Sequence, residues 1–168
     1  MTPDERIREA RQFAAPVLDV AEAGFKQQAD EYDAAYRQTL DSLKADVSED
    51  GAARIRDRAL DRLSHADSPV AAAQHLIENA SNPQELGVIL QEVPSWLESR
   101  GHSAAFIPQV VARVRPDVAE AATKRQKAQQ AAEIGRQTIA QVRRGIDTAC
   151  PAKHLMIADK VRQYDPDA

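Results

Sequence analysis

The longest uninterrupted helical pattern in this sequence runs from Asp117 to Ala149 and constrains the fold more than any other stretch. It contains no proline, and residues that favour helix dominate it. Along one face lie Val118, Ala121, Ala128, Ala132, Gly135, Ile139, Val142 and Ile146, and the positions in the middle of this face are alanine and glycine. Small residues let a second helix approach closely but bury little apolar surface themselves. The sequence therefore predicts a partner helix that carries large side chains.

A helix at about residues 17–47 supplies those side chains. Its large apolar residues recur at intervals of three, four or seven: Leu18, Phe25, Tyr32, Tyr36, Leu40, Leu43 and Val47. We expect the two helices to run antiparallel, with two residues opposite each other when their numbers add up to about 164. In this register large side chains of one helix meet small ones of the other, as interdigitated packing requires. This register places Ala29 opposite Gly135 and predicts a Glu22–Arg143 ion pair. We expect an antiparallel helical hairpin.

Shorter helices are predicted on either side of these two. Thr2 and Pro3 favour a helix start, with Phe13 on the same face as Ile7, Ala10 and Ala14, and Pro16 is expected to kink or restart that helix. Residues 50–115 read as a block of short helices, because Pro69, Pro83, Pro94 and Pro108 each mark a start or restart. A short amphipathic helix is predicted at 151–164, with Leu155, Met156, Ile157 and Val161 on its apolar side. The fold class is all-α, a helical bundle formed by a single domain of residues 1–168.

Composition indicates the cellular compartment in which the protein is expected to act. Cys150 is the only cysteine, so the chain cannot form an intrachain disulfide or a four-thiolate zinc site. The first residues are charged and unlike a secretory signal, and no apolar run is long enough to span a membrane. We expect a cytoplasmic protein that does not act at membranes. A small chain rich in alanine, arginine and glutamine is typical of bacterial or phage accessory proteins.

No motif in the sequence indicates catalysis, a cofactor or a bound metal. Phosphate-binding glycine loops, nucleophile elbows and paired-histidine zinc motifs do not occur. Three pairs have metal-ligand spacing on a helix, namely Asp61 with His65, His75 with Glu78, and Glu98 with His102, but none forms a Glu-x-x-His motif. We expect the protein not to be an enzyme and to hold neither cofactor nor metal.

The charge of the chain is unevenly distributed. Residues 1–100 hold 11 Lys/Arg and 19 Asp/Glu, a net charge of −8, whereas residues 101–168 hold 11 and 7, a net charge of +4. The cations of the long C-terminal helix form a candidate nucleic-acid-binding face: Lys124, Arg125, Lys127, Arg136, Arg143 and Arg144. Because no aromatic residues interleave with them, pairing with the acidic 17–47 helix is the preferred interpretation.

A non-enzymatic helical interaction module is the predicted function, and the class includes adaptors, scaffolds, inhibitors and assembly factors. Its partner would be another protein, possibly a second copy of the chain, and the alternative is a nucleic-acid-associated protein. Trp96 and Phe106 are the candidate partner-binding residues, because aromatic residues are favoured anchors at interfaces. The competing interpretation, that both belong to the core, is favoured by their position in an apolar block.

Overall fold

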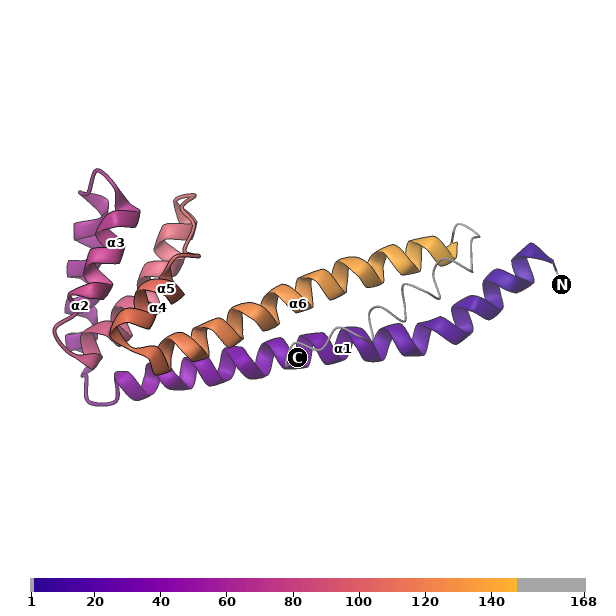
Figure 1. The fold of residues 1–168 in the computed structure, drawn as a ribbon, viewed down its shortest axis with the longest axis horizontal. Helices are drawn as coiled ribbons and strands as arrows, with labels where there is room; N and C mark the ends of the chain where they lie inside the picture. The colour runs from indigo at the N-terminus through magenta and orange to yellow at the C-terminus, as the bar shows by residue number, and fades with distance from the viewer. Residues whose placement is uncertain (1, 148–168) are drawn as a thin grey trace. The chain divides into compact units, whose positions relative to one another are not determined.

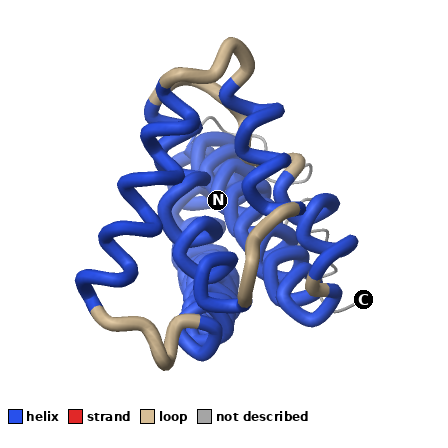
Figure 2. Tube along the Cα trace, turned by 90° about the vertical axis from the view of Figure 1, so that its left-hand side faces the viewer, coloured by secondary structure: helices blue, strands red, loops and turns tan. Residues whose placement is uncertain are grey.

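The computed structural model describes residues 2–147, and these contain helices and connecting turns but no strand (Figures 1 and 2). The helices are α1 (Pro3–Leu43), α2 (Glu49–Ser64), α3 (Pro69–Glu78), α4 (Pro83–Ser99), α5 (Ile107–Val114) and α6 (Pro116–Asp147). The all-α prediction is confirmed, including two long helices with short ones between them. The predicted 151–164 helix and Cys150 lie outside the described residues.

Side-chain caps start three of the short helices where the sequence predicts a break. Ser48, Ser68 and Asn82 each accept a hydrogen bond from a backbone N–H in the first turn of the following helix. A free helix N-terminus leaves several backbone donors without partners, so each cap satisfies one of them. Pro69 and Pro83 then occupy the first turn, where a missing N–H costs nothing.

Two prolines lie inside helices instead of interrupting them. A kink or a restart was expected at Pro16, and the restart is wrong, because α1 is one helix from Pro3 and passes through Pro16. Pro16 is exposed, so water can reach the carbonyl that its ring leaves without a donor. The restart predicted at Pro94 is also wrong, because α4 continues to Ser99. That helix buries apolar residues both before and after Pro94, and their packing outweighs the lost hydrogen bond.

The described residues group into two compact units, and both long helices contribute to each. Unit 2 comprises residues 34–124, and its core joins the end of α1, the short helices and the start of α6. Helix α2 packs against α3 and α4, and α3 packs against α4 and α5. Gly87 permits the close approach of α4 to α1, since a β-carbon there would lie 2.9 Å from Lys44 Cγ and 3.0 Å from Leu43 Cβ.

Unit 1 comprises residues 1–33 and 125–168, and its described part is an antiparallel pair of helix segments. Its core cluster contains Leu18 from α1 and Ile139, Val142 and Ile146 from α6. Phe25 is partly buried and packs against this cluster. Three alanines of α1 complete it, at positions 10, 14 and 21. The predicted pairing of large residues on α1 with α6 is therefore present in unit 1.

The register of this pair differs from the prediction near its middle. The three atoms nearest to a β-carbon built on Gly135 all belong to the ring of Phe25, which lies one turn before the predicted partner, Ala29. The ring needs the space that only glycine leaves, and this requirement sets the register locally. Towards the other end, Leu18 and Ile146 share one cluster as predicted.

Candidate functional site

Trp96 lies on α4 and is incompletely covered by the core of unit 2. Its side chain packs against the core cluster on one side and remains partly exposed. The guanidinium of Arg100, one turn later, lies 4.4 Å above the indole ring. A cation over an indole face is stabilised by the electron-rich ring, by about 0.5–1 kcal/mol at an exposed site. The spacing of four residues within one helical segment was the signal that could have indicated this pair.

The end of α4 is fixed just beyond Arg100. Gly101 has φ +79°, a left-handed conformation that glycine adopts without steric cost. Its N–H donates to the carbonyl of Glu98, and the N–H of His102 donates to that of Leu97. These two bonds form a Schellman motif. The motif ends the helix at Ser99, with Arg100 as the C-terminal cap residue, and holds the backbone that presents the stacked pair.

Phe106 follows in the connection to α5. It stands at the N-terminal cap position of α5, partly exposed, and packs against the same core cluster as Trp96. Neither aromatic side chain is fully buried, and both contribute to the core of unit 2. We call Trp96, Arg100 and Phe106 the Trp96 surface.

The candidate basic residues of α6 are mostly engaged with carboxylates. Arg125 binds Asp33 at 2.6 Å, and Arg143 binds Glu22 at 2.7 Å and Asp19 at 2.8 Å. The predicted Glu22–Arg143 pair is therefore present. The remaining partners lie on α6 itself: Lys124 with Glu120, Arg136 with Glu133, and Arg144 with the carbonyl of Ala140. Lys127 is exposed.

These ion pairs change proton affinities in the expected direction. The hydrogen bond from Arg143 to Glu22 raises the pKa of the Arg143 guanidinium. The hydrogen bond from Arg136 to Glu133 raises the pKa of Arg136 in the same way. In return, the hydrogen bond from Arg136 lowers the pKa of Glu133. A cation already neutralised by a carboxylate attracts phosphate less, so these six residues form a weaker nucleic-acid face than their number indicates.

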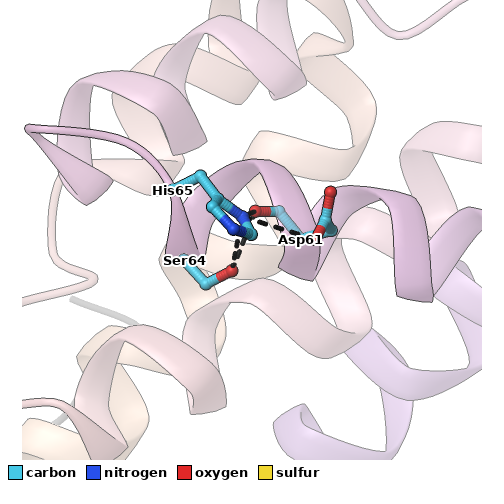
Figure 3. A network of polar contacts seen from close by, with 3 residues as sticks. All are labelled: Asp61, Ser64 and His65. Atoms are coloured by element: carbon cyan, nitrogen blue, oxygen red, sulfur yellow. Dashed lines mark hydrogen bonds and ion pairs between the residues drawn. The ribbon is translucent and has the colours of Figure 1, made fainter.

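A serine, a histidine and an aspartate meet at the end of α2 (Figure 3). The Nδ1 atom of His65 lies 2.9 Å from the carbonyl oxygen of Asp61, 3.4 Å from its carboxylate and 3.3 Å from Ser64 Oγ. A catalytic triad needs the serine and the carboxylate on different ring nitrogens, so that one nitrogen accepts the proton of the serine while the other donates a hydrogen bond to the carboxylate. Here the same nitrogen faces all three, and the side chains are exposed. The cluster is a polar helix end.

Two further findings concern metal binding and membrane insertion in the described part of the chain. Among residues 2–147 no group of three or more His, Cys, Asp or Glu side chains could hold a metal ion. The pairing of Asp61 with His65 occurs, without a further ligand. Within the same residues no helix is long and apolar enough to cross a membrane.

Sequence reasoning missed one apolar surface in unit 1. Phe13, Val20 and Ile134 expose 68%, 73% and 45% of their surfaces. Phe13 was predicted to share the inner face of Ala10 and Ala14. The helix continues through Pro16 in phase with Leu18, so Ala10 and Ala14 turn towards the core and Phe13 lies a third of a turn away. The continuous phase of α1 was the signal that could have revealed this.

Comparisons with protein-family models, with curated proteins and with solved structures find no match to this chain.

Proposed function

We propose that the protein is a non-enzymatic helical interaction module that binds another protein through the Trp96 surface. The observation that carries this proposal is the partly exposed Trp96 with Arg100 stacked on its ring. Tryptophan and arginine are the residue types most enriched among those that dominate binding energy at protein interfaces. A partner that covers the pair would remove it from water and strengthen the cation–π contact.

The fold supports this use of the surface. Trp96 and Phe106 share one core cluster, and the Schellman motif at Gly101 fixes the backbone beside the stacked pair. A surface held in place before binding loses less conformational freedom on association. Roles as an adaptor, scaffold, inhibitor or assembly factor all fit such a rigid apolar anchor.

A nucleic-acid-associated function is the alternative that α6 would support. Two of its six candidate cations bind carboxylates of α1, and two more bind carboxylates of α6. A nucleic acid would have to displace these carboxylates. The preferred partner is therefore a protein, in the cytoplasm of a bacterial or phage-infected cell.

Site-specific photo-crosslinking of the full chain in its native cell tests the proposal. A benzophenone amino acid replaces Ser99, which is exposed and one turn from Trp96. The matched control replaces Asp57, exposed on α2 of the same unit. We expect a defined protein adduct from position 99 and none from position 57. The substitution Arg100→Glu, which leaves the core intact, should abolish the adduct.

The same experiment distinguishes the protein-binding function from the nucleic-acid-associated alternative. A third probe at Lys127 lies on the exposed part of α6. If this probe forms adducts with nucleic acid that weaken steeply with salt while position 99 stays silent, the nucleic-acid function is favoured and the proposal fails. An adduct from position 99 that survives Arg100→Glu also contradicts the role of the stacked pair.

A further inference from the structure

Helix α1 carries an exposed stripe within unit 1. Its members recur at intervals of three, four or seven residues, so they lie on one side of the helix: Arg6, Phe13, Val17, Val20, Gly24, Gln27 and Glu31. All of them except Val17 are exposed, and Phe13 and Val20 expose 68% and 73% of their surfaces. The members between Arg6 and Glu31 are uncharged. We call these residues the α1 stripe.

Ile134 of α6 lies on the same side of unit 1 as the stripe. Glu22 follows Phe13 by nine residues on α1, and Arg143 follows Ile134 by nine residues on α6. Nine residues of helix correspond to a rotation of about 180°. Since Glu22 and Arg143 bond to each other at 2.7 Å, they mark one side of the helix pair, and Phe13 and Ile134 lie on the opposite side.

The α1 stripe is complementary in size to a second copy of itself. When two identical helices pack antiparallel about a twofold axis, two residues lie opposite each other if their numbers add up to a constant. With a sum of 37, Phe13 lies opposite Gly24 of the second copy, and Val17 lies opposite Val20. A β-carbon built on Gly24 meets nothing within 4 Å, so this position has room for a phenyl ring. The large residue therefore meets the small one, as in interdigitated packing.

The same register brings opposite charges together at both ends of the stripe. Arg6 lies opposite Glu31 of the second copy, and the symmetry makes this contact twice. Both side chains are exposed in the single chain, where Glu31 accepts a hydrogen bond from Gln27. Registers about one turn away, with sums of 33 or 41, would place Glu31 opposite Thr2 or Ala10 instead. Exposed ion pairs add little affinity but specify partner and orientation, so the charges favour the sum of 37.

Ile134 lies at the height of the same contact. Gly135 meets the ring of Phe25, so its neighbour Ile134 stands at about the height of Phe25 along α1. In the register given above, the second copy's Phe13 stands at the height of Gly24, on the same side. A single arrangement thus covers all three large apolar side chains that the described part of unit 1 exposes.

We propose that two copies of the chain pack their α1 stripes antiparallel, with a residue sum of 37, and form a homodimer through unit 1. The stripe is about 38 Å long. It contributes fewer residues than the roughly 20–30 that each partner supplies to a standard interface. The dimer is therefore weak, and the chain is a monomer at the low micromolar concentrations of optical unfolding assays. The inference does not depend on the Trp96 surface, which belongs to unit 2.

Sedimentation equilibrium of the full chain tests the dimer. We expect the average mass to rise from 18.4 kDa towards twice that value between about 5 and about 500 μM, because association follows mass action. Phe13→Ala should raise the dissociation constant at least about tenfold, since a symmetric interface loses the ring twice. Phe13 is exposed in the single chain, so this variant keeps its helices, as circular dichroism would verify. Val114→Ala, at an exposed site in unit 2, is the matched control and should leave the dimer unchanged.

An exchange of charges tests the register. Arg6→Glu sets two anions opposite each other at both ends of the stripe, and Glu31→Arg sets two cations there. Each variant alone should therefore dimerise about tenfold more weakly than the unchanged chain. In a mixture of the two variants, each end carries one cation and one anion again. We expect the equimolar mixture to form a heterodimer with about the affinity of the unchanged dimer.

Several results would overturn the proposal. A mass of 18.4 kDa at every concentration excludes the dimer. Dimerisation that is unchanged by Phe13→Ala excludes the α1 stripe, and loss of that dimer in Arg100→Glu assigns it to the Trp96 surface instead. A mixture of the two charge variants that dimerises no better than each variant alone contradicts the antiparallel register.

Discussion

The contact between Gly135 and Phe25 gives the sharpest prediction for the packing of unit 1. A β-carbon at position 135 would lie 2.5 Å from Phe25 Cδ2, 2.6 Å from Cε2 and 3.0 Å from Cγ. Carbon atoms in contact are normally about 3.5–4.0 Å apart, so the whole ring must move by about 1 Å. Overpacking of this kind costs about 1–3 kcal/mol. Alanine in place of glycine inside a helix recovers about 1 kcal/mol. Gly135→Ala should therefore lower the free energy of unfolding by about 0–2 kcal/mol.

Gly24→Ala is the matched control on the partner helix. Gly24 also lies within a long helix, but it is exposed and a β-carbon there would meet nothing within 4 Å. This variant should gain about 1 kcal/mol of stability from helix propensity alone. Urea unfolding followed by far-ultraviolet circular dichroism reports on both variants, since helix signal comes from both units. The two variants should differ by about 1–3 kcal/mol.

A double variant tests whether the difference in stability between Gly135→Ala and Gly24→Ala arises from the ring of Phe25. In the background of Phe25→Ala the obstacle is absent, so Gly135→Ala should become stabilising by about 1 kcal/mol, like Gly24→Ala. If Gly135→Ala stabilises the intact chain as much as Gly24→Ala does, the close packing of α6 on Phe25 is refuted.

Three further predictions concern unit 2. The hydrogen bond from Arg115 lowers the pKa of Asp117 from 3.8 to about 2. The stabilisation that this bond gives to the fold is therefore complete above pH 3.8 and is lost as the pH falls towards 2. Arg115→Gln should return the pKa of Asp117 towards 3.8 in a carboxyl NMR titration. Asn82→Ala should cost about 1 kcal/mol in urea unfolding, because it removes the cap of α4, and an unchanged midpoint would contradict that role. Gly101→Ala should cost about 1–2 kcal/mol in the same assay because φ is +79°, and a neutral result would argue against the left-handed helix end.

The fold class was predictable because helix periodicity and caps are local properties of the sequence. The alanine-rich seam of α6 required a partner with large side chains, and Leu18 and Phe25 of α1 meet it in unit 1. Proline was the misleading signal. Its effect depends on whether water reaches the freed carbonyl and on how much apolar surface the helix buries, and both are tertiary properties that the residues around Pro16 and Pro94 do not reveal.

The register and the candidate site depend on contacts that sequence spacing does not specify. Leu18 and Ile146 share one cluster, but Gly135 meets the ring of Phe25, one turn away from Ala29, its predicted partner. An aromatic ring can fill the space beside a glycine from more than one position along the facing helix. Trp96 could be selected as the sole tryptophan of the chain. Its partial exposure and its stack with Arg100 depend on how α4 packs and on side-chain conformation, which sequence spacing does not specify.

The central claim is that the Trp96 surface binds a protein partner, and an exchange footprint of the complex tests it most directly. The full chain is mixed with the protein captured from position 99, and amide exchange is compared with that of the free chain. We expect new protection at residues 94–107, around Trp96 and Phe106, that Arg100→Glu removes. Protection confined to residues 124–144 of α6 would contradict the claim and place the binding surface on the basic helix.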